Sequence, residues 1–304
     1  MSLVNNNRIL FLWLNDKEFH SINAKRRGVE TANAYKHISK FLKVFRRLYI
    51  MLGLFSISPW LGDWKKKIQE YNVIIVHSSL ITSLIVRYIS VKAPSVRIIV
   101  WYWNPVAKSE KLEKYPENIC ERWSFDEKDV QDYNLKYNTQ YYFNDIKLDN
   151  NNILWDVYFV GGDKGRLAIL LDLQKKLNEM GLVTNFHITK TSNNIVNDSI
   201  YKNRINYSQN IEFLSKSKAV LDIVSPGQTG LTLRPLEALF FNKKLITNDK
   251  TIIQRDFYDE KNIFVLGHDD FNNLNYFLNS PSKIISEEIK NKYDFDHWIN
   301  RFFN

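Results

Sequence analysis

Short apolar runs alternate with stretches of helical spacing along the chain of 304 residues. In the first half, the apolar runs predict strands at residues 8–14, 72–76, 97–101 and 140–143. The stretches between these runs predict helices near residues 29–50, 62–70 and 79–90. Such alternation is typical of parallel sheets that are covered by helices on both faces. We therefore predict a doubly wound α/β sheet in the first half.

The second half repeats the same alternation more regularly. The predicted strands are residues 155–160, 183–188, 219–224, 244–247 and 263–266, and the predicted helices are residues 165–180, 208–215 and 233–241. Between the halves, the polar segment "KLDNNN" has the composition of a linker. The pattern predicts an α/β fold with two Rossmann-like domains facing across a cleft, residues 1–150 and 151–304.

Composition narrows the class of protein. The chain is 44% hydrophobic and 25% charged, which is typical of a soluble globular protein. A single cysteine, Cys120, cannot form an intramolecular disulfide, so we expect a reducing cytosolic compartment. The apolar run at residues 9–14 has no basic flank or cleavage site, so we do not expect a signal peptide. The run at residues 48–60 is too short to span a bilayer.

The net charge of +9 is concentrated in one part of the chain. The segment from Lys25 to Lys67 contains eleven cationic and two anionic residues, and the rest of the chain is neutral overall. The segment "YKHISKFLKVFRRLYIMLGLF" places apolar residues three or four positions apart, which predicts a basic amphipathic helix. Its apolar positions are Ile38, Phe41, Leu42, Phe45, Leu48, Tyr49 and Leu52, and its basic positions are Lys36, Lys40, Lys43, Arg46 and Arg47.

Two interpretations of this helix stay open. It is either a core helix with a solvated basic face or a helix that lies in an anionic membrane surface. Nucleic-acid binding is less favoured, because the sequence has no zinc finger, aromatic-basic strand signature or helix-turn-helix pattern. We therefore expect no nucleic-acid partner.

Two loops that follow predicted strands carry the chemistry. In the first, the strand "WDVYFV" runs into "GGDKGR". Gly161 and Gly162 permit a close backbone approach, Lys164 and Arg166 supply cations, and a helix begins directly afterwards; these are the parts of a phosphate site. The spacing is neither that of a P-loop nor that of a dinucleotide fingerprint. An ordinary strand-to-helix turn is the alternative.

The second loop is "SPGQTGLTLRPLEAL", residues 225–239. Gly227 and Gly230 permit tight backbone geometry. Arg234 and Glu237 lie one turn apart on the helix that follows. The planar Arg234 fork suits phosphate or carboxylate, and Glu237 can accept hydrogen bonds from sugar hydroxyls. The alternative is that Arg234 and Glu237 only pair with each other.

These motifs resemble those of GT-B type glycosyltransferases, especially the retaining enzymes of glycosyltransferase family 4 and their relatives in bacterial capsule and lipopolysaccharide assembly. The resemblance covers residues 155–250, from "VGGDKGRLAILLDLQKKL" to "TGLTLRPLEALFFNKKLIT". It implies that Lys164 and Arg166 grip the donor diphosphate and that Glu237 binds the ribose. It also implies that Thr229, Gly230, Leu231 and Thr232 line the donor sugar and phosphates. The family has a first glutamate eight positions before Glu237, where this chain has Thr229.

The same resemblance suggests how the first half takes part. The segment "RRG" is similar to the basic loop that approaches the donor phosphates from the opposite domain, which implicates Arg27 and Gly28. The last helix, within "DFDHWINRFF", is expected to return to the first domain. An inverting reaction would need a base, and the candidates after the predicted strands are Asp16, Glu18, His20 and His77.

The resemblance implies a glycosyltransferase that moves a sugar from a nucleotide-sugar donor to a glycan or lipid-linked acceptor in bacterial surface polysaccharide synthesis. We expect it to be cytoplasmic and peripheral on the inner face of the cell membrane. No cofactor is expected, because the nucleotide-sugar is a substrate. "HDD" at residues 268–270 is interpreted as a helix N-cap, so we expect no metal. A sugar-nucleotide epimerase and a non-catalytic partner that recruits a transferase stay open as alternatives.

Overall fold

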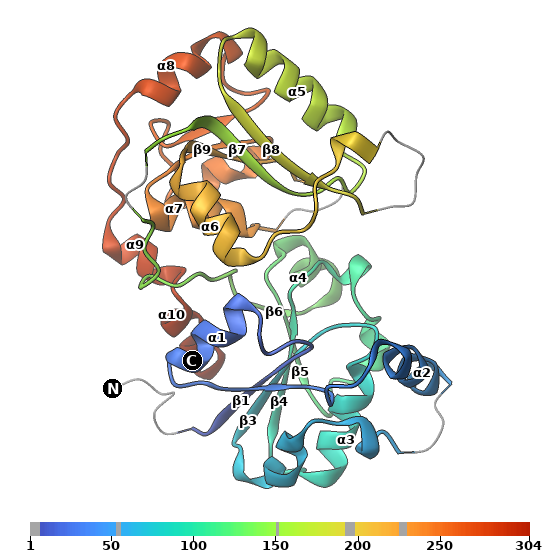
Figure 1. Cartoon of the computed structure of the whole chain (residues 1–304). Helices are drawn as coiled ribbons and strands as arrows, with labels where there is room; N and C mark the ends of the chain where they lie inside the picture. The colour runs from blue at the N-terminus through green and yellow to red at the C-terminus, as the bar shows by residue number, and fades with distance from the viewer. Residues whose placement is uncertain (1–6, 53–55, 150–151, 192–197, 225–229) are drawn as a thin grey trace. The chain divides into compact units, whose positions relative to one another are not determined.

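The computed structural model describes all residues except 1–6, 53–55, 150–151, 192–197 and 225–229 (Figure 1). The chain forms two compact units. The first comprises Met1–Gln140 and Phe295–Asn304, and the second comprises Tyr141–Asp294. Among the helices that the structure describes, none has both the length and the apolar character needed to cross a membrane.

The first unit is built on a sheet of six parallel strands in the order β2-β1-β3-β4-β5-β6. The strands are β1 (Ile9–Trp13), β2 (Glu30–Asn33), β3 (Val73–His77), β4 (Arg97–Tyr102), β5 (Glu121–Ser124) and β6 (Lys136–Tyr137). The helices are α1 (Phe19–Arg26), α2 (Lys40–Met51), α3 (Ser83–Lys92), α4 (Glu127–Tyr133) and α10 (Phe295–Asn300). The central strands β1, β3 and β4 are apolar at nearly every position because both faces of the sheet are covered there.

Alternate residues of each strand enter two different cores. Leu10 and Val76 point to the face that is covered by α3 and by the 3-10 helix Asp63–Glu70. Phe11 and Trp101 point to the other face, where Trp298 of α10 stacks on Phe11 at a centroid distance of 5.9 Å and meets Trp101 edge-on at 5.3 Å. The last helix of the chain therefore completes the core of the first unit.

The second unit contains five parallel strands in the order β11-β10-β9-β7-β8. They are β7 (Trp155–Gly162), β8 (Thr184–Thr189), β9 (Ser217–Asp222), β10 (Lys244–Thr247) and β11 (Ile263–Val265). The helices are α5 (Leu167–Glu179), α6 (Tyr207–Ser215), α7 (Leu233–Phe241), α8 (Leu274–Asn279) and α9 (Glu287–Lys292). Helices α5 and α8 pack on one face of this sheet, while α6 and α7 contact its strands from the other side (Figure 1).

Several predicted elements of the first half differ from the structure. Residues 140–143 are not a strand: Tyr142 makes one isolated bridge to Asp294, and the buried aromatic run "YYF" only looks like a core strand. The predicted helix at 29–50 begins with strand β2, whose sequence "ETAN" is short and polar. Helix α1, β5 and β6 lack a clear apolar period and were not predicted. Residues 63–70 are 3-10 rather than α-helical.

The two units divide after Gln140, earlier than the boundary predicted at residue 150. The reason is hydrogen bonding by the backbone N–H groups next to the division. The Tyr142 N–H donates to the Tyr293 carbonyl at 2.8 Å, and the Asn144 N–H donates to Asp294 Oδ1 at 2.8 Å. These bonds join residues from 141 onward to the second unit, although the polar linker composition begins only later.

Candidate functional site

Each sheet has one point at which its strand order reverses. In the second unit, α5 leads from β7 to β8 on one side, and α6 leads back to β9 on the other side. The point therefore lies between β7 and β9. Ligands of open parallel sheets bind at the carboxyl ends of strands at such a point. Gly161 and Gly162 end β7 there, and Asp222 ends β9.

Two guanidinium groups meet at this point. Arg166 stands at the N-cap of α5, and Arg234 lies in the first turn of α7. Both lie against the ring of Phe159, at 5.2 and 5.5 Å from its centroid. Arg166 donates to the carbonyl of Gly162 at 3.1 Å, and Arg234 donates twice to the carbonyl of Val160 at 3.0 and 3.2 Å. The strand's own backbone thus holds both side chains.

Within the described residues, only one of these two guanidinium groups forms an ion pair. Arg234 Nη1 pairs with Asp222 Oδ1 at 2.9 Å, and Thr232 donates to the other oxygen of Asp222 at 2.9 Å. Burial, followed by the nearby charge of Arg234, lowers the pKa of Arg166 to about 10. Arg166 also lies within electrostatic reach of the Asp163 carboxylate, so the two guanidinium groups are accompanied by two carboxylates. The exposed Lys164 that follows Asp163 brings a further positive charge to this place. Such a place favours an anionic ligand.

Gly161 allows the two guanidinium groups to lie this close to the backbone. A Cβ atom added at Gly161 would lie 2.8 Å from Arg234 Nη2 and 3.2 Å from Arg166 Nη2. Any side chain would therefore push at least one of them away. The sequence indicated Gly161 as a point of close approach, and in the structure the guanidinium groups of Arg166 and Arg234 occupy the space beside it.

The loop after β7 is held by Asp163. Its Oδ1 accepts from the N–H groups of Lys164 at 2.7 Å and Thr191 at 3.0 Å, and Oδ2 accepts from the Tyr201 hydroxyl at 2.9 Å. Burial opposes the charge, but hydrogen bonds from Thr191 and Tyr201 outweigh it and lower the pKa of Asp163. The loop turns through Lys164, whose φ of +42° is rare for a residue with a side chain. An ionised Asp163 therefore fixes the exposed Lys164 beside the arginine pair.

A groove of about 250 Å³ opens at the same edge of the sheet. It is lined by Val160, Gly161, Gly162, Lys164, Thr189, Thr191, Arg204 and Ile205. Lys164 and Arg204 supply its cations, while glycine backbone and threonine hydroxyls supply neutral polar groups. Such a lining suits phosphate oxygens. Arg204 was not identified from the sequence, because no motif marks its position.

Glu237 belongs to α7, and its side chain takes part in a hydrogen-bonded network with residues of α6. The Tyr207 hydroxyl donates to Glu237 Oε1 at 2.6 Å, and Asn210 Nδ2 donates to the same oxygen at 2.9 Å. Tyr207 also lies 2.7 Å from the Tyr142 hydroxyl, and the Tyr158 hydroxyl donates to Asn210 at 2.9 Å. Burial raises the pKa of Glu237. Within the described residues, Oε2 accepts no hydrogen bond.

The remaining donor-loop residues divide into two groups. Gly230, Leu231 and Thr232 lead directly into α7; Leu231 is buried, and Thr232 stands at the N-cap. Gly227 and Thr229 lie outside the described residues, so their predicted contacts with the donor stay predictions. The alternative in which Arg234 and Glu237 only pair with each other is not what the structure has, because Arg234 pairs with Asp222.

The candidate bases lie at the corresponding point of the first sheet, between β1 and β3. Burial lowers the pKa of both His20 and His77 to about 3, which makes these imidazoles weak proton acceptors. They pack among aromatic rings, and His77 lies 4.4 Å from the centroid of Trp13. Asp16 is half-buried and accepts from Asn33 at 2.7 Å. Glu18 is exposed at the N-cap of α1.

Arg27 and Gly28 close helix α1. Gly28 has φ of +84°, the left-handed conformation that glycine supplies at helix ends. Arg27 Nη1 pairs with Asp296 Oδ2 of α10 at 2.6 Å. Both residues therefore have structural roles within the first unit. Their approach to the donor phosphates stays a prediction.

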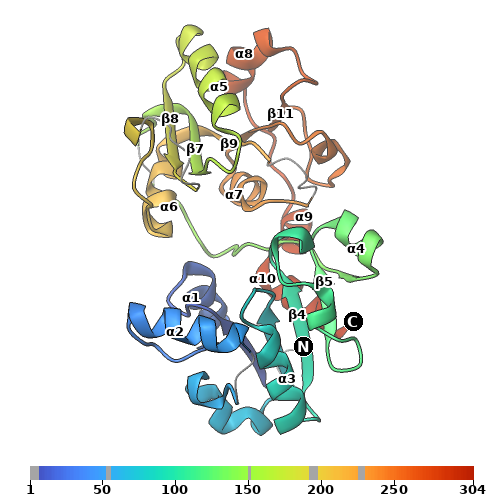
Figure 2. The ribbon, with the colours of Figure 1, turned by 90° about the vertical axis from the view of Figure 1, so that its right-hand side faces the viewer.

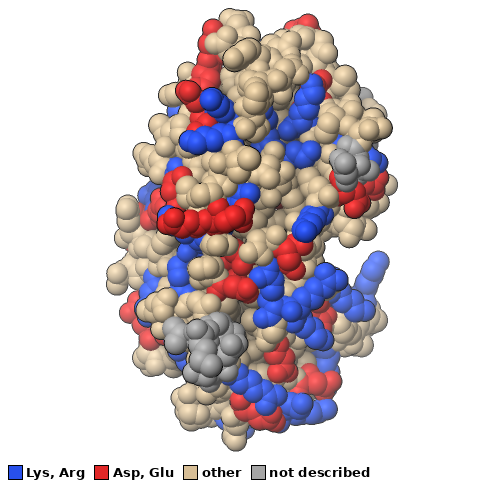
Figure 3. All heavy atoms as spheres, turned by 90° about the vertical axis from the view of Figure 1, so that its left-hand side faces the viewer, with Lys and Arg blue, Asp and Glu red and all other residues tan. Residues whose placement is uncertain are grey.

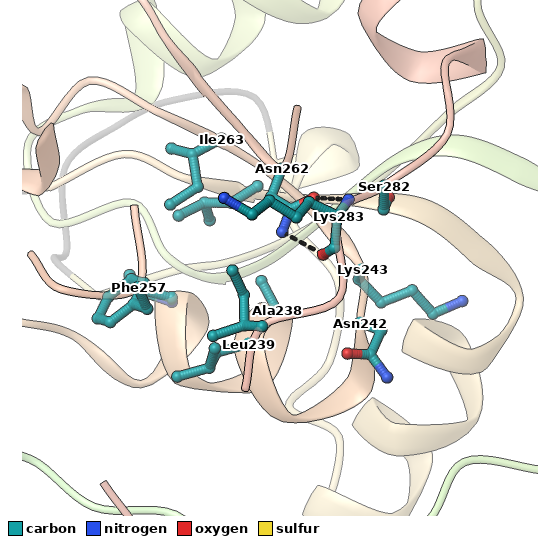
Figure 4. Close-up of a pocket in the computed structure, with 12 residues that line it drawn as sticks. Ala238, Leu239, Asn242, Lys243, Phe257, Asn262, Ile263, Ser282 and Lys283 are labelled. Atoms are coloured by element: carbon teal, nitrogen blue, oxygen red, sulfur yellow. Dashed lines mark hydrogen bonds between the residues drawn. The ribbon is translucent and has the colours of Figure 1, made fainter. Parts of the chain in front are cut away.

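Another pocket in the second unit lies on the other side of α7 (Figure 4). Ala238 and Leu239 line it from the helix, and Asn262 and Lys283 exchange backbone and amide hydrogen bonds across it at 2.7 and 2.8 Å. Its volume is about 20 Å³, enough for roughly one water molecule. It is too small for a nucleotide. No group of three or more potential metal ligands occurs within the described ranges.

Comparison with known proteins identifies the fold. No protein-family model and no curated protein sequence matches the chain. Among solved structures, the DNA-modifying enzyme β-glucosyltransferase, determined with and without uridine diphosphoglucose, superposes with a TM-score of 0.51. It is 14% identical, and the match covers 97% of this chain and 94% of that one.

Two further solved structures match with lower scores. TarM superposes with a TM-score of 0.44 at 12% identity; 76% of this chain matches, but it spans only 50% of TarM. A Listeria monocytogenes protein assigned as a UDP-N-acetylglucosamine 2-epimerase has a TM-score of 0.44 at 9% identity, over 97% of this chain and 94% of that one. At such identities the comparison with β-glucosyltransferase extends to the fold alone. The chain has the fold of GT-B proteins, with two Rossmann-like units, and the predicted fold class is confirmed.

Proposed function

We propose that this protein is a glycosyltransferase that uses a nucleotide-sugar donor. One observation carries the proposal: two largely buried guanidinium groups, Arg166 and Arg234, lie together at the reversal point of the second sheet, next to a groove lined by the further cations Lys164 and Arg204. A nucleoside diphosphate supplies the missing negative charge. During transfer, further charge develops on the departing diphosphate, and donors fixed in advance in a poorly solvated place stabilise that charge most effectively.

The other residues of the site have matching roles in this proposal. Lys164 and Arg204 border the adjoining groove and would contact the outer phosphate oxygens. Glu237 Oε2 would accept from a ribose hydroxyl. The transfer breaks the bond between the anomeric carbon and the diphosphate oxygen, and it forms a bond from that carbon to an acceptor hydroxyl. Asp16 and Glu18 are the better candidates for a base, because their side chains are at least partly open to solvent whereas His20 and His77 pack among aromatic rings.

The acceptor is proposed on a different basis. The resemblance of residues 155–250 to capsule and lipopolysaccharide enzymes supports a glycan or lipid-linked acceptor in bacterial surface polysaccharide synthesis. The structural relative β-glucosyltransferase is a DNA-modifying enzyme. An acceptor panel should therefore include duplex DNA beside lipid-linked sugars, although we expect transfer to the sugars only.

Thermal unfolding with a panel of nucleoside diphosphates tests the donor site. A ligand at 100 times its dissociation constant adds about 2.7 kcal/mol of stability, which gives a clear shift in Tm. The variant Arg166→Met should lose most of that shift. Its apoprotein should unfold near the wild-type Tm, because methionine fills the space and repulsion from Arg234 is removed. Lys175→Met is the matched control, since its side chain is 76% exposed on α5 and should change nothing.

Product analysis then separates the three candidate functions. A transferase releases nucleoside diphosphate as the sugar appears on an acceptor. An epimerase changes the sugar while it stays attached to the nucleotide. A non-catalytic partner binds but produces neither change. Absence of any Tm shift with every nucleoside diphosphate would refute the donor site itself.

A further inference from the structure

Helix α2 presents its apolar face to solvent. Phe41 is 80% exposed, Val44 61% and Leu48 53%. At about 100° per residue these three lie on one side of the helix, and Phe45 and Leu52, which are also exposed, flank them. Figure 2 shows the helix turned towards the viewer. Isolated exposed apolar residues are common, but a continuous stripe of this size marks an interaction surface.

The inward side of α2 carries a buried cation, Arg46, beside the apolar Ile50. Ile50 enters the core, and Arg46 is also buried. The Arg46 guanidinium lies 4.4 Å from the centroid of the Tyr35 ring and donates to the Lys36 carbonyl at 3.3 Å. Burial lowers the pKa of Arg46. A cation therefore faces inward while large apolar side chains face outward, which is the reverse of an ordinary surface helix.

Cations border the exposed stripe. Lys40, Lys43 and Arg47 lie along one edge of it and are exposed. The sequence of α2 contains no acidic residue. By contrast, on the face drawn in Figure 3, Lys and Arg are interspersed with Asp and Glu. Exposed apolar residues bordered only by cations match the chemistry of an anionic membrane surface.

A groove continues this surface from Arg47 and Ile50. It has a volume of about 450 Å³ and is also lined by Leu80, Ser83, Leu84, Arg87, Glu110 and Lys114. Arg47, Arg87 and Lys114 supply three cations against one carboxylate, and none of the three forms an ion pair with a described residue. Leu80, at its rim, is 58% exposed. The groove thus offers cations for a phosphate next to apolar side chains for the acyl region.

We propose that α2 and this groove dock the protein on an anionic lipid surface, with Phe41, Val44 and Leu48 inserted and a headgroup phosphate held by Arg47, Arg87 and Lys114. Self-association through the same face is opposed by charge, since it would bring the bordering cations of two copies together. This inference does not depend on the donor site, because it concerns only the first unit.

Binding to vesicles tests the proposal without any nucleotide-sugar. The full chain should co-sediment with phosphatidylcholine vesicles that contain phosphatidylglycerol, and much less with pure phosphatidylcholine. The double variant F41S/L48S should lower the partition coefficient at least about tenfold, since two side chains no longer insert. Val91→Ser is the matched control, because Val91 is 76% exposed on α3 but lies outside the stripe.

A second pair of variants tests the groove. R87Q/K114Q should reduce binding to the anionic vesicles about tenfold and weaken its dependence on salt. K66Q/K67Q removes the same number of cations elsewhere in the first unit and should bind like the wild type. Equal sedimentation of the wild type and F41S/L48S would overturn the proposal. So would a wild-type dimer without lipid that becomes monomeric in F41S/L48S, because the stripe would then be an interface between copies.

Discussion

Replacing Glu237 with glutamine tests the roles of its two carboxylate oxygens separately. Tyr207 and Asn210 both donate to Oε1, at 2.6 and 2.9 Å. The amide oxygen of Glu237→Gln can occupy that position and keep both bonds. The amide nitrogen then occupies the position of Oε2, so an acceptor that faces the ligand becomes a donor. The substitution thus preserves the internal network and changes the group proposed to bind ribose.

The expected loss follows from that one contact. A hydrogen bond to a charged group contributes about 1.5–3 kcal/mol, so the nucleoside diphosphate should bind roughly 10- to 150-fold more weakly. The apoprotein should not be destabilised at neutral pH, because the buried charge is removed. Burial raises the pKa of Glu237, so its ionisation costs stability as pH rises through the folded-state pKa. Any stability gain of Glu237→Gln should therefore shrink towards acid pH.

Calorimetric titration and thermal unfolding measure the two effects separately. Tyr207→Phe is the matched control: it removes one donor to Oε1 and leaves Oε2 unchanged. It should lower stability by about 1 kcal/mol while affinity for the diphosphate stays close to wild type. Unchanged affinity in Glu237→Gln would refute the assignment of Oε2 to the ligand. Loss of stability in that variant equal to the loss in Tyr207→Phe would show that Glu237 is a structural residue only.

Three further predictions concern other parts of the molecule. Gly161→Ala should weaken diphosphate binding about tenfold, measured by titration. Its methyl carbon would lie 2.8 Å from Arg234 Nη2 and would displace that guanidinium group. Burial opposes the charge of Glu121, but hydrogen bonds from Arg97 and Lys136 lower its pKa to about 2. The ionised Glu121 therefore contributes up to roughly 3 kcal/mol to the free energy of unfolding, and this contribution should be present above pH 4.5 and lost as pH falls towards 2. Acid titration of Glu121→Gln should therefore converge with wild type near pH 2, and a persistent gap would contradict the linkage. Finally, we expect a chelator to leave sugar transfer unchanged; a loss that Mg²⁺ or Mn²⁺ restores would show that a metal is needed.

The second half was easier to predict from sequence than the first. Residues 233–241 and 244–247 form the predicted helix and strand with the same bounds, because each has a clear apolar period between polar or glycine residues. Strand β2, by contrast, is only "ETAN". A short, polar edge strand is specified by pairing with β1, which no local pattern reports.

The site shows the same limit. Sequence motifs indicated Arg166, Arg234 and Glu237, because each follows the end of a predicted strand. They did not indicate the partners Asp222 and Tyr207, since contacts between distant segments determine those. The basic helix was predicted as amphipathic, but periodicity alone cannot tell whether its apolar side faces a core or solvent.

The chain leaves the first unit at Gln140 and returns to it at Phe295, so the second unit is an insertion in the first. During synthesis, every residue of the second unit leaves the ribosome before the first unit has its last helix. Trp298, which packs on Phe11 and Trp101, is synthesised only after the whole second unit. Until then the aromatic face of the first sheet is uncovered. We infer that the second unit can fold first, and that removal of residues 295–304 would impair the N-terminal sheet while the inserted unit keeps its fold.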